Sequence, residues 1–118
     1  MRSLLEHSLS LFRQVGDKFG AVECLSRLSS LINATGDTKQ AILLTEEQLA
    51  LRREIGDQDG IATTLGDLSR FASMQGDYQR AIALHEKSLA IYRAVGNKWA
   101  ISYSLSSIAD NFMWKEDY

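Results

Sequence analysis

Residues 65–90 read LGDLSRFASMQGDYQRAIALHEKSLA, and the Gly76-Asp77 pair near their centre separates two segments with helical apolar spacing. Glycine recurs at 20-residue steps, and an acid or amide follows each one: Gly16, Gly36, Gly56, Gly76 and Gly96. Glycine tolerates the left-handed conformation that ends a helix, and the next side chain can accept hydrogen bonds from the following helix's first turn. The pattern predicts six helices, over about 1–15, 18–35, 38–55, 58–75, 78–95 and 98–115.

Alternate segments differ, so the true repeat is 40 residues long. Segments 1–15, 41–55 and 81–95 share one pattern, which we call the B helix, and segments 18–35, 58–75 and 98–115 share another, the A helix. The A pattern aligns apolar residues at matching positions: Val22, Leu25, Leu28 and Ile32 with Ala62, Leu65, Leu68 and Ala72. The expected fold class is therefore all-α, a run of antiparallel helix pairs without strands.

The stretch Leu65…Leu68-Ser69…Ala72…Gly76-Asp77-Tyr78…Ala81…Ser88-Leu89 resembles a tetratricopeptide repeat. Ser29, Ser69 and Ala109 stand where that family usually has glycine, and the closing proline is absent. The lengthened repeats are similar to those of bacterial regulators of the MalT and LuxR type and of kinesin light chains. The resemblance implies one tetratricopeptide-like domain over 1–118, stacked as a right-handed superhelix (an α–α solenoid). Its expected parts are a B helix at 1–15, repeats at 16–55 and 56–95, and a partial repeat at 96–118.

Composition excludes several function classes. Hydrophobic residues make up 45% of the chain and charged residues 24%, as in ordinary globular domains. The net charge of −2 provides no general attraction to nucleic acid or anionic membrane. No apolar run is long enough to span a bilayer, and a single cysteine excludes an internal disulfide. We expect a cytoplasmic segment, and its uncapped repeat ends favour a fragment of a longer protein over a small complete one.

Motifs for catalysis, cofactors or metals are not found in the sequence, so we expect no enzyme activity, no cofactor and no metal. Gly16-Asp-Lys-Phe-Gly20 looks like half of a nucleotide-binding loop, but its recurrence as Gly56-Asp-Gln-Asp-Gly60 indicates a repeat junction. His7 and His85 lie on separate B helices, and Cys24 lies in an A helix beside Leu25. Packing roles are expected for all three.

The inner face of the A helices is the candidate binding surface. In stacked helical hairpins the A helices line the concave side, and each A helix leaves a second stripe beside its core stripe. The predicted peptide-binding face comprises Glu23, Arg27, Ser30, Asn33, Thr63, Asp67, Arg70, Met74, Tyr103, Ser107, Asp110 and Trp114. No lysine lies on these stripes, which disfavours a clamp for chaperone C-terminal carboxylates. The same residues would also suit an ordinary solvated face.

Two functions remain open. The first is a protein- or peptide-binding module, the sensing or interaction segment of a larger bacterial regulator. The second is a self-association element, in which uncovered repeat ends form a homodimer. At the C-terminal end the expected contacts are Leu105, Ile108, Phe112 and Trp114. At the N-terminal end part of Leu4, Leu5, Leu9 and Phe12 is expected to be exposed, because the A partner of that helix is missing.

Overall fold

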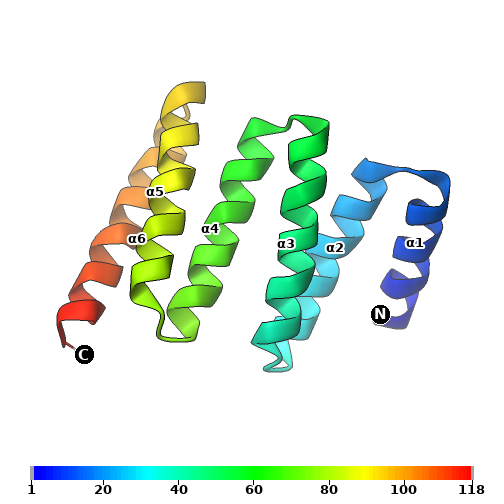
Figure 1. The fold of residues 1–118 in the computed structure, drawn as a ribbon, viewed down its shortest axis with the longest axis horizontal. Helices are drawn as coiled ribbons and strands as arrows, with labels where there is room; N and C mark the ends of the chain where they lie inside the picture. The colour runs from blue at the N-terminus through cyan, green and yellow to red at the C-terminus, as the bar shows by residue number, and fades with distance from the viewer. Residues whose placement is uncertain (1, 118) are drawn as a thin grey trace. The chain divides into compact units, whose positions relative to one another are not determined.

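The computed structural model describes residues 2–117, with side chains for residues 2–113, and contains six helices (Figure 1). They are α1 (Arg2–Val15), α2 (Lys18–Ala34), α3 (Thr38–Ile55), α4 (Gln58–Met74), α5 (Tyr78–Val95) and α6 (Lys98–Asp117). Residues 2–117 include no strand. Five of the helices begin at the residue predicted from the sequence and α1 begins one residue later, so the all-α prediction is confirmed.

Each helix after the first begins with the predicted side-chain cap. The Oδ1 atoms of Asp17, Asp37, Asp57, Asp77 and Asn97 each accept a hydrogen bond from the backbone N–H three residues later, over 3.0–3.2 Å. These bonds satisfy donors that the first helical turn leaves without a partner. The starts of α2 to α6 are therefore encoded locally.

Glycine ends the two classes of helix in two ways. Gly56 and Gly96 are themselves the left-handed C-caps of α3 and α5, with φ of 82° and 78°. In contrast, α2 and α4 end on Thr35 and Gln75, and the left-handed glycine follows one residue later. Both arrangements require a positive φ that other residues rarely adopt.

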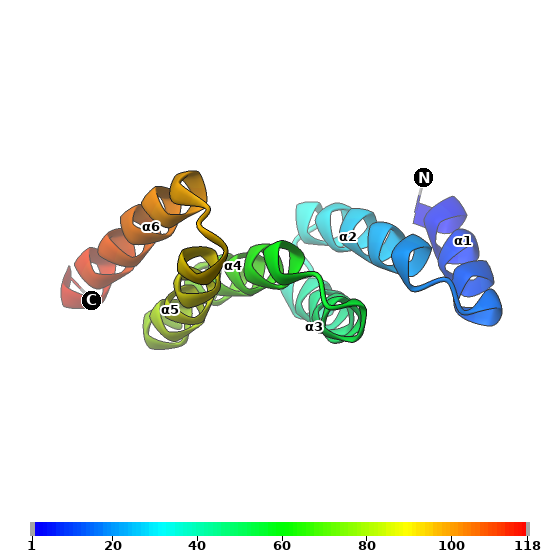
Figure 2. The ribbon, with the colours of Figure 1, turned by 90° about the horizontal axis from the view of Figure 1, so that it is seen from above.

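The helices form two compact units, Met1–Gly56 and Asp57–Tyr118. In the first unit α2 packs against both α1 and α3, as Figures 1 and 2 show. Its core contains Leu5, Leu9, Ala21, Cys24, Leu25 and Leu28. On the surface, Arg13 of α1 pairs with Glu47 of α3 over 2.5 Å. The unit is thus an A helix between two B helices.

In the second unit α5 packs against both α4 and α6 (Figure 2). The predicted core stripe of α4, Ala62, Leu65, Leu68 and Ala72, is buried. Ser69 Oγ on α4 donates a hydrogen bond to the backbone carbonyl of Ala81 on α5 over 2.6 Å. The serine that replaces the family's usual glycine therefore joins the two helices of its repeat.

One expectation for the N-terminal helix is wrong. Leu5 and Leu9 are buried, at 9% and 4% exposure, because α1 packs its apolar face on α2. Leu4 is 65% exposed, as expected, and Phe12 is half-buried. The ring of Phe12 lies so close to Gly20 that a Cβ atom there would be 2.4 Å from it. The following A helix therefore covers this face even without a preceding A helix.

The corresponding apolar stripe on α6 is partly open. Leu105 and Phe112 are each 46% exposed and Ile108 is half-buried, whereas Leu65, Leu68 and Ala72 of α4 are buried at the matching positions. Within residues 98–113 of α6, the buried side chains are those of Ser104 and Asn111. The described part of α6 thus uses its polar side against its own unit and leaves an apolar side uncovered.

Candidate functional site

A groove of about 290 Å³ lies within the second unit, and we call it the α4–α6 groove. One side consists of residues from α4: Thr63, Gly66, Asp67, Arg70 and Ser73. The floor is contributed by α5: His85, Ser88 and Tyr92. The other side belongs to α6: Tyr103, Ser104, Ser107, Asp110 and Asn111.

Hydrogen bonds between the helices hold the groove in shape. Ser73 Oγ on α4 donates to Asn111 Oδ1 on α6, and Asn111 Nδ2 donates to the Ser107 carbonyl over 2.9 Å. The hydroxyls of Thr63 and Tyr92 lie 2.8 Å apart and join α4 to α5. These polar side chains fix α4, α5 and α6 relative to one another. The groove is therefore largely formed before any ligand binds.

The floor contains a histidine, His85, with a buried ring nitrogen that has no hydrogen-bond partner among the described residues. Ser88 Oγ donates to the Ala62 carbonyl over 2.7 Å, but the Nδ1 atom of His85 is buried without a hydrogen-bond partner. The His85 side chain is only 5% exposed. Burial lowers the pKa of its imidazole below the usual value of 6.5, because removal from water disfavours the charged form. His85 is therefore neutral at pH 7.

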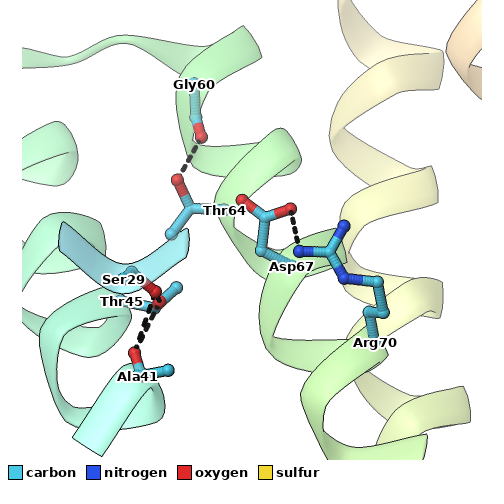
Figure 3. A network of polar contacts seen from close by, with 7 residues as sticks. All are labelled: Ser29, Ala41, Thr45, Gly60, Thr64, Asp67 and Arg70. Atoms are coloured by element: carbon cyan, nitrogen blue, oxygen red, sulfur yellow. Dashed lines mark hydrogen bonds and ion pairs between the residues drawn. The ribbon is translucent and has the colours of Figure 1, made fainter. Parts of the chain in front are cut away.

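The charges of the groove are few and mixed. Arg70 reaches Asp67 on its own helix over 3.8 Å, as Figure 3 shows, and its guanidinium lies 5.3 Å from the centre of the Phe71 ring. Asp110 lies across the groove on α6 and is exposed. The groove thus offers a guanidinium, two carboxylates and several hydroxyl and amide groups to a ligand.

The structure brings together half of the predicted binding face. The α4–α6 groove is lined by Thr63, Asp67, Arg70, Tyr103, Ser107 and Asp110. Arg27 and Ser30 line a separate shallow pocket of about 340 Å³ in the first unit, with Leu5, Ser26 and Leu31. The predicted stripe therefore divides into two local surfaces, of which the α4–α6 groove has the richer polar lining.

The remaining predicted residues have other surroundings. Glu23 is exposed and pairs with Arg27 over 3.3 Å. Asn33 is half-buried, and its Oδ1 accepts a hydrogen bond from the Thr38 hydroxyl over 3.2 Å. Met74 is exposed beyond the residues that line the α4–α6 groove. The side chain of Trp114 lies outside the described residues.

Sequence reasoning missed the floor of the groove. His85, Ser88 and Tyr92 belong to a B helix, whereas the predicted binding face consists of A-helix residues alone. A signal does exist in the repeat alignment, because His85 and Ser88 occupy the slots of Thr45 and Gln48 in the previous repeat. A polar position at which the residue type differs between repeats is therefore the signal that could identify His85 and Ser88 from the sequence.

Other candidate chemistry is not assembled in the described structure. Cys24 is buried in the core of the first unit, and burial raises the pKa of its thiol. Among the side chains that can be described, no three His, Cys, Asp or Glu residues are grouped so that they could hold a metal ion. Within the same part of the chain, none of the helices is long and apolar enough to cross a membrane.

Comparison with known proteins agrees with this architecture. The crystal structure of the apo form of RapI is similar to the chain, with a TM-score of 0.87 and 14% sequence identity, over 99% of this chain and 43% of RapI. The chain thus spans less than half the length of that relative, and the likeness shows the fold. No characterised protein matches at the level of sequence. The sequence model of the tetratricopeptide repeat matches residues 23–94, which is more than half of the chain. The chain therefore belongs to the tetratricopeptide repeat family.

Proposed function

We propose that the chain is a protein-interaction module that binds a peptide segment in the α4–α6 groove. The supporting observation is the groove itself, whose sides come from two A helices and whose floor comes from the B helix between them. Tetratricopeptide repeats generally mediate binding between proteins, and the all-helical fold of RapI is of the same kind. The module acts as a non-catalytic scaffold in this proposal.

Arg70 is the residue whose loss tests the groove. It is exposed and lies off the core stripe, where it makes a long ion pair with Asp67 and lies over the face of the Phe71 ring, so its removal should cost little stability. A panel of synthetic 12-residue peptides of varied composition is titrated against the full chain. Arg70→Ala should weaken the peptides that bind by about 1–3 kcal/mol, the range for hydrogen bonds to charged groups. Arg53→Ala, an exposed change on α3, is the matched control.

The double variant Arg27→Ala/Arg70→Ala extends this test to the first unit. Arg70 lines the α4–α6 groove, and Arg27 lines the shallow pocket of the first unit. If the double variant and the wild-type chain bind every peptide equally well, neither pocket is the site and the proposal is wrong.

Self-association through α6 is the second candidate function. Leu105 and Phe112 are exposed on the stripe that α5 covers in the preceding A helix, and contiguous apolar surface of this kind commonly marks an interface. Two-fold pairing of like ends closes at a dimer, whereas head-to-tail stacking continues without limit. A homodimer through this stripe is therefore the form that we propose.

The wider setting of the module is also a proposal. Its likeness to repeats of bacterial regulators suggests the interaction segment of a cytoplasmic regulator. Sequencing of the gene around this segment tests that setting. A flanking ATPase or DNA-binding domain would support the regulator, and a gene that encodes only these residues would favour the self-association element.

A further inference from the structure

His85 lies on the groove floor at a position where the preceding repeat has Thr45. The hydroxyl of Thr45 has its hydrogen-bond partners within the fold. In the first unit, Thr45 Oγ1 donates to the Ala41 carbonyl over 2.8 Å and lies 2.7 Å from Ser29 Oγ, as Figure 3 shows. In the second unit, Ser69 keeps its bond to the Ala81 carbonyl, but His85 makes no hydrogen bond to any described residue. The fold itself therefore does not require histidine here.

The surroundings of the two ring nitrogens determine which one carries the proton. Among the described side chains, Nδ1 of His85 is the buried atom left without a partner, so Nε2 is the nitrogen that reaches the groove. A neutral imidazole has one N–H donor and one acceptor nitrogen. Since a buried N–H without a partner is rarer and costlier than an unsatisfied acceptor, the proton is held on Nε2. His85 thus presents a fixed donor to the groove.

The charged and polar side chains that line the groove around His85 determine which charge on a ligand would be favoured. From α4, Arg70 and Asp67 face each other and offset their charges. From α5, the Tyr92 hydroxyl is joined to Thr63. From α6 come Tyr103 and Asp110, and Asp110 has no ion-pair partner among the described residues. Among the described residues, one exposed carboxylate thus has no cation paired with it beside a neutral donor.

We propose that the α4–α6 groove selects a peptide segment with a basic side chain, with His85 Nε2–H donating to a carbonyl of the peptide and Asp110 pairing with its lysine or arginine. This inference rests on the peptide-binding function proposed above. Because the exposed ion pair of Asp110 contributes little affinity by itself, the buried donor at the floor fixes the register of the ligand.

The first test needs no ligand. The full chain, labelled with ¹⁵N-histidine, is measured by two-dimensional NMR at pH 7.5, and His85→Thr assigns the signals because His7 is the other histidine. The expected result is the Nε2–H tautomer for His85. The Nδ1–H tautomer would overturn the inference, because the groove would then face an acceptor.

The second test measures selectivity with three capped heptapeptides, Ac-AAAKAAA-NH2 and its glutamine and glutamate counterparts, by NMR titration of the full chain. The lysine peptide should bind about three- to fivefold more tightly than the glutamate peptide, and Asp110→Asn should abolish that preference. His85→Thr should weaken all three peptides by about five- to tenfold. Asp59→Asn, an exposed acid of α4 outside the groove, is the matched control and should change nothing.

The outcomes separate the two proposals. If peptides bind and Arg70→Ala weakens them, while His85→Thr and Asp110→Asn have no effect, the binding function stands and this inference is wrong. If the 12-residue panel contains binding peptides but none of these three peptides binds at millimolar concentration, this inference is wrong and the binding function stands.

Discussion

The hydroxyls of Ser29 and Thr45 lie 2.7 Å apart in the buried interface between α2 and α3, and each lies within hydrogen-bond distance of the Ala41 carbonyl. Serine at this A-helix position recurs at Ser69, where it donates to Ala81. The small hydroxyl side chain thus fits between the two helices and adds a hydrogen bond between them.

Ser29→Ala should lower the free energy of unfolding by about 1–2 kcal/mol, because it removes this bond and leaves a buried acceptor less satisfied. Ser30→Ala, one residue further along on the exposed side of α2, should change it by less than about 0.5 kcal/mol. Urea denaturation followed by circular dichroism compares the two. Equal effects would show that the buried bond contributes nothing.

Asp77→Ala should destabilise the chain by about 1 kcal/mol, because the first turn of α5 loses the acceptor for the Arg80 N–H. Asp77→Asn keeps a capping oxygen and should remain close to wild type. Thermal unfolding at neutral pH distinguishes them. A stable alanine variant would mean that water replaces the cap at no cost.

Two glycines inside helices should respond to alanine in opposite directions. Gly66→Ala should stabilise the chain by about 0.5–1 kcal/mol, since a Cβ atom there meets open space and alanine is the better helix former. Gly20→Ala should destabilise it, because the new methyl group collides with the Phe12 ring. Chemical denaturation measures both. The prediction fails if the two variants shift stability in the same direction.

His85 should make stability depend on pH in a defined direction. Its pKa is lowered on folding, so the unfolded chain takes up a proton first as the pH falls below 6.5. Stability is therefore full above pH 6.5, declines below it, and becomes level again once the folded state also binds the proton. His85→Thr should be more stable than wild type, by an amount that grows between pH 7.5 and 5.5.

Denaturation with urea at pH 7.5, 6.5 and 5.5 measures that difference for the two chains. A constant difference across these three values would contradict the assignment of the titrating group. If His85→Thr is less stable than wild type, the imidazole packs better at this position than threonine, the residue that the preceding repeat has there.

Phe112→Glu should dissociate a dimer that uses the uncovered stripe of α6, because it places a charge within a desolvated interface. Leu4→Glu, at an exposed apolar residue of α1, is the counterpart for the N-terminal end. Light scattering coupled to size exclusion measures the mass of each chain. A wild-type chain that remains a monomer of about 13 kDa at high micromolar concentration would exclude self-association.

The fold could be predicted from the sequence because its signals are local. Gly76 and Asp77 specify the end of one helix and the start of the next through bonds to residues a few positions away. The α4 side of the groove followed from helical periodicity for the same reason. Arg70 and Asp67 occupy one face of a helix whose core stripe had been identified correctly.

The floor of the groove could not be found this way. The position of His85 depends on how α5 lies between α4 and α6, and helical periodicity alone marks such a residue as core. The burial of Leu5 and Leu9 was missed for a related reason. The prediction considered the missing A helix before α1 but not α2, which follows α1 and covers these two side chains.

The strong helix contacts within each unit join neighbours in the chain: α1 with α2, α2 with α3, α4 with α5, and α5 with α6. No remote segment has to be brought in to complete a unit, so the entropy lost in closing loops before the first favourable contacts is small. Proteins built in this way fold in microseconds to milliseconds. A nascent unit could therefore acquire its native pairing while the ribosome is still adding the next helix, since synthesis proceeds at only about 5–20 residues per second.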